Sequence, residues 1–113
     1  MNKSTEVFLE TIMTKKHDEI VELANAIASN RKHKVTLTND GLYDGESYGP
    51  LYYWADFFDL DSESLDTYKL KCLVAVIVDQ LSALGYGEYN VEEDYPYEDS
   101  KREMNCIIRK RIH

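Results

Sequence analysis

An apolar segment between residues 62 and 84 places the strongest constraint on the fold of this chain. Its aliphatic residues recur at intervals of three and four, so they share one face of a predicted helix. Val76 and Val78 make the flanks of that face apolar as well. Such a helix must be covered on more than one side, so we expect it at the centre of the fold, with Asp61 or Ser62 as its N-cap. The residues of the face are Leu70, Leu73, Val74, Ile77, Leu81 and Leu84.

A second apolar stripe predicts a long helix over residues 5–30. A straight helix of that length would measure about 39 Å, whereas a domain of this size has a radius of gyration of about 13 Å. Two arrangements are therefore open. The helix breaks near residues 15–17, where Lys16 interrupts the stripe, or its N-terminal half projects and pairs with a second copy. The apolar residues of that half are Phe8, Leu9, Ile12 and Met13.

The rest of the chain predicts strands and one short helix. Alternating apolar residues indicate strands at about residues 32–38, 87–93 and 103–112. A loop with three glycines covers residues 41–49, and Pro50 suits the first turn of a short aromatic helix. The element order α-β-α-α-β-β predicts a single α+β domain over the whole chain, residues 1–113, with a small, mostly antiparallel sheet packed on helices.

The charge is concentrated in the middle of the chain. Residues 39–99 carry 15 acidic and two basic residues, a net charge of −13, whereas residues 1–38 carry +1 and residues 100–113 carry +4. Such a field repels the phosphates of nucleic acids and membranes and attracts basic surfaces. We therefore expect a basic protein partner and no membrane partner, and we do not expect direct nucleic-acid binding, although basic residues cluster at positions 101–111.

No motif for catalysis or for a cofactor is recognisable. None of His17, His33 and His113 lies in a nucleophile-and-base pattern, and there is no phosphate-binding glycine loop. The segment 59–63 begins like an EF-hand loop, but Ser64 stands where glycine is required, and the bidentate glutamate is also missing. These patterns favour a protein that is not an enzyme and has no cofactor, with a small divalent-metal domain as an alternative.

The chain shows no signal peptide and no apolar run of transmembrane length. Its two cysteines, Cys72 and Cys106, are far apart in sequence, and we interpret them as buried reduced thiols. Both observations predict a cytoplasmic protein.

The remaining signal is a set of carboxylates with interleaved tyrosines. We hypothesise that they dock on a basic partner that handles nucleic acid, such as a nuclease, with carboxylates in place of phosphates and tyrosines as anchors. Small acidic inhibitors of phages and mobile elements, and many immunity proteins, act on this principle. The plainer alternative is a set of solvated faces, and a homodimer through the first helix is a further one. The candidate residues are Asp56, Asp59, Asp61, Glu63, Glu92, Glu93, Asp94, Tyr95, Tyr97, Glu98 and Asp99.

Overall fold

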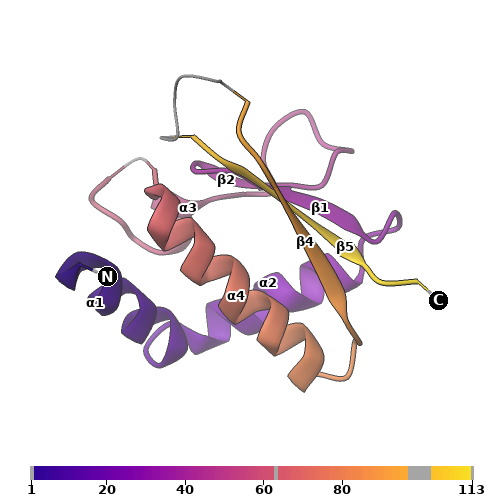
Figure 1. The fold of residues 1–113 in the computed structure, drawn as a ribbon, viewed down its shortest axis with the longest axis horizontal. Coiled ribbons are helices and arrows are strands. Elements are labelled where there is room, and N and C mark those ends of the chain that lie inside the picture. The colour runs from indigo at the N-terminus through magenta and orange to yellow at the C-terminus, as the bar shows by residue number, and fades with distance from the viewer. Residues whose placement is uncertain (1, 63, 97–102, 113) are drawn as a thin grey trace.

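The structure, a computed structural model, describes residues 2–62, 64–96 and 103–112, which form an α+β domain (Figure 1). Three longer helices pack on one face of a five-stranded antiparallel sheet, and no helix among the described residues covers the other face. The predicted fold class is thereby confirmed. The elements are α1 (Lys3–Met13), α2 (His17–Ala28), β1 (Lys34–Leu37), β2 (Gly41–Tyr43), β3 (Tyr52–Tyr53), α3 (Trp54–Phe57), α4 (Thr67–Ala83), β4 (Tyr89–Asp94) and β5 (Asn105–Lys110).

The long N-terminal helix breaks into α1 and α2 at residues 14–16. The longest dimension of the molecule is 37 Å, so an unbroken helix of about 39 Å would extend along all of it. The break lets both halves pack against α4, and it places Phe8 and Ile12 of α1 in the core. Of the two predicted arrangements, the structure has the break, and Met13 remains exposed on α1.

The central helix α4 has the apolar face that its spacing predicts. Five residues of this face are buried, but Leu84 lies beyond the helix and is 40% exposed. The predicted start at residue 62 is wrong, because the helix begins at Thr67. Its N-cap is Asp66, whose side-chain oxygen accepts a hydrogen bond of 2.8 Å from the backbone N–H of Lys69. The buried residues are Leu70, Leu73, Val74, Ile77 and Leu81.

Two short strands occupy a region that the sequence predicts as loop and helix. The loop at residues 41–49 contains β2, and β3 takes Tyr52–Tyr53, so the helix α3 begins at Trp54 and not at Pro50. The close approach of these strands requires glycine at position 41, because a Cβ there would lie 2.1 Å from the backbone oxygen of Tyr52. Trp54 is fully buried and donates from Nε1 to the backbone oxygen of Thr38 at 2.8 Å.

The strand order is β3-β2-β1-β5-β4, so β4 is an edge strand. In β1 and β5 the buried residues alternate with more exposed ones, and Val35 and Ile108 pair on the face toward the helices. In β4 only Tyr89 is buried, and the rest of the strand is exposed. Most of β4, residues 90–94, is therefore left exposed by the helix layer.

Candidate functional site

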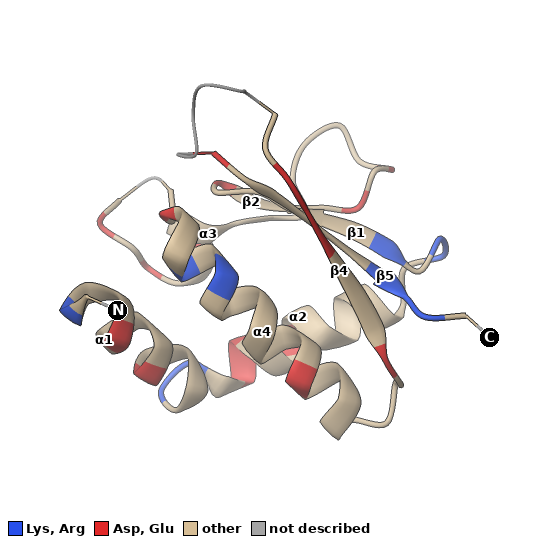
Figure 2. Ribbon diagram, viewed as in Figure 1, with Lys and Arg blue, Asp and Glu red and all other residues tan. Residues whose placement is uncertain are grey.

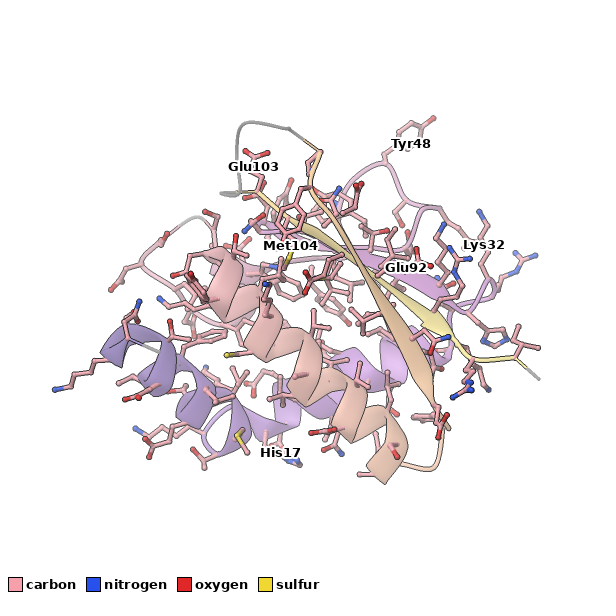
Figure 3. All side chains as sticks on the ribbon, in the orientation of Figure 1. His17, Lys32, Tyr48, Glu92, Glu103 and Met104 are labelled. Atoms are coloured by element: carbon pink, nitrogen blue, oxygen red, sulfur yellow. The ribbon has the colours of Figure 1, made fainter. Side chains whose placement is uncertain are left out.

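The antiparallel register separates positive from negative charge along the sheet. At one end, Lys34 of β1 pairs with Arg109 of β5, and at the other end Asp94 of β4 pairs with Asn105. Figure 2 shows the blue residues of β1 and β5 at one end and the red residues of β4 toward the other. Figure 3 shows Lys32 and Glu103 on opposite sides of the molecule. We call Asp40, Asp66, Glu92, Glu93, Asp94 and Glu103 the acidic end, and Lys32, Lys34, Arg109, Lys110 and Arg111 the basic end.

Asn39 holds the acidic end together. Its side-chain Nδ2 donates to the backbone oxygen of Leu65 at 2.9 Å, and its Oδ1 accepts from the backbone N–H of Met104 at 2.8 Å. The backbone N–H of Leu65 in turn donates to the backbone oxygen of Asn39 at 2.8 Å. One residue in the β1–β2 turn thus joins the segment before α4 to the start of β5.

The segments that Asn39 joins surround a polar cleft of about 500 Å³. Asp40, Asp66 and Glu103 lie along this cleft, and Lys69 is the cation among its lining residues. Within the described ranges no three His, Cys, Asp or Glu side chains are close enough to hold a metal ion. The cleft is therefore a negatively charged surface hollow. The other lining residues are Thr38, Asn39, Ser62, Ser64, Leu65 and Asn105.

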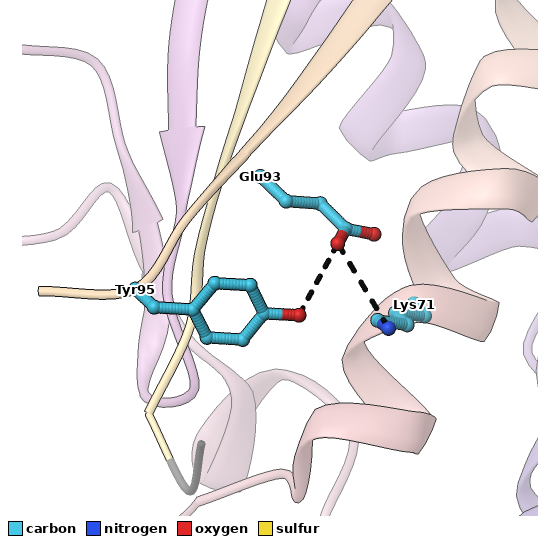
Figure 4. A network of polar contacts seen from close by, with 3 residues as sticks. All are labelled: Lys71, Glu93 and Tyr95. Atoms are coloured by element: carbon cyan, nitrogen blue, oxygen red, sulfur yellow. Dashed lines mark hydrogen bonds and ion pairs between the residues drawn. The ribbon is translucent and has the colours of Figure 1, made fainter. Parts of the chain in front are cut away.

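The carboxylates of β4 alternate between the two faces of the sheet. Glu92 pairs with Ile107 on the open face, whereas Glu93 pairs with Cys106 on the helix side. Glu93 Oε2 lies 3.9 Å from Lys71 Nζ of α4 and accepts a hydrogen bond of 3.2 Å from the hydroxyl of Tyr95 (Figure 4). Both charged side chains are more than 40% exposed, so this ion pair contributes at most about 1 kcal/mol.

Burial changes the chemistry of the neighbouring thiol. Cys106 is 1% exposed, and its burial, together with the charge of Glu93, raises the pKa of the thiol to about 11. Cys72 is only partly buried, and both cysteines are free. Cys106 is thus a neutral core residue beneath β4.

The structure places the other predicted residues away from β4. Asp56 lies on α3, and Asp59 and Asp61 lie in the segment between α3 and α4, all three exposed. Asp59 Oδ2 is 3.8 Å from Lys16 Nζ at the α1–α2 junction, so this group lies beside the helix layer. The segment between α3 and α4 approaches the start of β5 at the polar cleft, which Ser62 and Asn105 both line. Glu63, Tyr97, Glu98 and Asp99 lie outside the described residues.

Sequence reasoning missed the basic end as a unit. Lys32 and Lys34 precede or begin β1 and join Arg109 around a hollow of about 440 Å³. Arg111 pairs with Glu88 at 2.9 Å, and His33, at a φ of +52°, has a buried Nδ1 without a hydrogen-bond partner among the described residues. The pairing of β1 with β5, which local sequence does not encode, was the missing information.

No protein family, curated protein or solved structure matches this chain. Among the described residues, none of the helices combines the length and the apolar character that a bilayer crossing requires. The function of the protein is therefore inferred from the arrangement of its charged residues and from the helices and strands that carry them.

Proposed function

We propose that the protein is a non-enzymatic interaction protein whose acidic end binds a basic, nucleic-acid-handling partner such as a nuclease. The partner is inhibited because carboxylates occupy the surface that binds phosphates. One observation carries this proposal. Of the six carboxylates of the acidic end, only Glu93 is in an ion pair with another described residue, and Lys34 and Arg109 lie at the other end of the sheet from Asp94, with Glu92 between the two ends.

The positions of these carboxylates support the proposal. Glu92 and Asp94 lie on the same face of β4 and are about 6.8 Å apart along it, because a strand advances about 3.4 Å per residue. One strand of duplex DNA carries one phosphate per about 3.4 Å of axis, so this separation equals about two phosphate steps. Asp66 is held as the cap of α4, and Asn39 fixes the surrounding segments. A surface fixed before binding loses less entropy when the complex forms.

The charge layout also predicts how binding depends on salt. A negative surface steers a positive partner and speeds association, and this attraction falls as the screening length shortens. We place the complex in the cytoplasm, where the free thiols Cys72 and Cys106 would stay reduced.

The test is capture of proteins from a cell extract on the immobilised protein at about 50 mM and about 500 mM salt. We expect nucleic-acid-binding proteins to be retained at low salt and released at high salt. The double variant Glu92→Gln with Asp94→Asn should lose them. The matched control, Glu6→Gln with Glu10→Gln on the exposed side of α1, removes the same charge elsewhere and should retain them. Equal retention by both variants, or no retention at low salt, would contradict the proposal.

A second candidate function is direct binding of a nucleic-acid backbone at the basic end. The observation that favours it is the convergence of Lys32, Lys34 and Arg109 with two further cations around one hollow. Anisotropy of a labelled single-stranded oligonucleotide would measure it. We expect Lys34→Gln with Arg109→Gln to reduce both the affinity and the salt slope, and Lys3→Gln with Lys15→Gln to leave them unchanged. The absence of binding at about 50 mM salt would exclude it.

A further inference from the structure

The outer edge of β4 has backbone groups free to pair with another strand. The backbone N–H of Arg111 donates to the oxygen of Glu88 at 2.9 Å, so Glu88 and the alternate residues after it direct their N–H and C=O groups toward β5. The intervening residues Val91 and Glu93 direct theirs away from β5. Within the described chain no strand lies beyond β4. The edge therefore offers a short row of unpaired donors and acceptors.

An apolar groove of about 370 Å³ runs beside this edge on the helix side. Val74 and Val78 of α4 form one wall, and Val91 and Cys106 of the sheet form the other. Val91 is 40% exposed, so α4 does not cover the edge strand. Apolar side chains from an additional strand would fill this groove, and their burial would stabilise a complex.

The charges around the edge select its occupant. Glu92 and Asp94 point out of the open face, two residues apart on the same side of β4. A strand paired with β4 would place alternate side chains over them, and like charges in directly opposite positions destabilise a strand pair. A second copy of β4 would bring three more carboxylates into the same ladder. A segment with alternating basic and apolar residues would place its basic side chains beside Glu92 and Asp94 on the open face and its apolar side chains in the groove on the helix side.

We propose that β4 is a docking edge for an extended segment of the basic partner, which adds to the sheet as a sixth, antiparallel strand. Its basic side chains lie over Glu92 and Asp94, and its apolar side chains fill the groove beside Val91. This inference rests on the proposed function and defines how the partner binds. When a peptide adds as a strand to a sheet edge, its backbone hydrogen bonds supply affinity and its alternate side chains supply specificity.

The test uses a synthetic peptide of alternating lysine and valine, about seven residues long, matching the length of an ordinary strand. In an antiparallel ladder the valines that face the groove also direct their amides at β4. We therefore expect N-methylation of the valine amides to weaken binding at least about tenfold, and N-methylation of the lysine amides to leave it unchanged. Both methylated peptides keep the full charge, so docking by charge alone would be indifferent to methylation.

Two further measurements act on the protein. Hydrogen exchange by NMR should show the amides of Val91 and Glu93 protected in the complex at least about tenfold, with the amide of Glu92, which bonds β5, as the internal reference. The variant Val91→Pro removes an outward N–H that makes no bond to β5, a position where an edge strand accepts proline. It should weaken binding about tenfold while Val91→Thr does not.

The outcomes separate this inference from the proposed function. Salt-dependent peptide binding that requires Glu92 and Asp94 but is insensitive to methylation, with Val91 and Glu93 unprotected, would overturn strand addition and leave the acidic end as the binding surface. No peptide binding even at about 50 mM salt would count against both. If methylation of the valine amides alone abolishes binding, the partner segment adds as an antiparallel strand. If methylation of the lysine amides alone abolishes it, the segment adds as a parallel strand, and the antiparallel orientation is wrong.

Discussion

Replacing Asn39 with alanine tests whether this residue holds the acidic end together. The substitution removes two side-chain hydrogen bonds, to the backbone oxygen of Leu65 at 2.9 Å and from the backbone N–H of Met104 at 2.8 Å. A buried polar group left without a partner costs about 1–3 kcal/mol. Both bonds are only partly buried, so water replaces some of the loss, and we expect a total destabilisation of about 2–4 kcal/mol.

This loss is large compared with the stability of about 5–15 kcal/mol that a domain has. Urea unfolding followed by circular dichroism measures it, and with a slope of about 1–3 kcal/mol per molar the midpoint should fall by about 0.7–4 M. Asn90→Ala is the control, because Asn90 is an exposed asparagine on β4, and it should change stability by less than about 0.5 kcal/mol. A loss below about 0.5 kcal/mol for Asn39→Ala would refute the role of Asn39.

Three other predictions concern the elements that position the site. Gly41→Ala forces a Cβ against the backbone oxygen of Tyr52, so thermal unfolding should show a loss of about 1–3 kcal/mol, and an unchanged melting temperature would contradict the close approach of β2 and β3. Asp66→Ala removes the cap of α4 and should cost about 1 kcal/mol, whereas Asp66→Asn should restore most of it in the same urea assay. Because the pKa of Cys106 is raised to about 11 in the folded protein, its contribution to stability is complete below the unfolded pKa of about 8.5 and is lost as the pH rises toward 11. Melting curves at increasing pH should therefore decline more steeply for the wild type than for Cys106→Ala, and identical declines would count against a thiol buried as a neutral group.

The sequence predicts the central helix well but misplaces its start. Asp61, Ser62 and Asp66 are all suitable caps, and local propensity does not choose among them. The choice is made by tertiary contacts, because Leu65 is 3% exposed and its backbone N–H donates to Asn39 from a different part of the chain. Such a bond keeps the residues before α4 out of the helix and cannot be read from helical spacing.

The short strands β2 and β3 illustrate a second limit. They contain three and two residues, too few for an alternating pattern to be recognised. Their pairing depends on the absence of a side chain at Gly41, which permits the approach of Tyr52. The turn at residues 39–41 is predictable from its composition, but the strand that follows it is not.

The candidate site is predictable only as a set of charges. The sequence identifies the carboxylates of residues 92–94, yet which groups meet depends on strand register. The register brings Lys34 beside Arg109 and Arg111 beside Glu88, and it places these cations at the other end of β5 from Asp94. The helix layer separates a further predicted residue from β4, because Asp59 lies 3.8 Å from Lys16 between α1 and α2.

The most direct test of the proposed function is displacement of nucleic acid from a captured basic partner. A fluorescein-labelled DNA duplex bound to that partner would be titrated with the wild-type protein and with the double variant Glu92→Gln and Asp94→Asn, while anisotropy is followed. The acidic end predicts that the wild-type protein releases the duplex and that the variant releases it far less effectively. A ternary complex that retains the duplex, or equal release by the two proteins, would show that these carboxylates do not occupy a phosphate-binding surface.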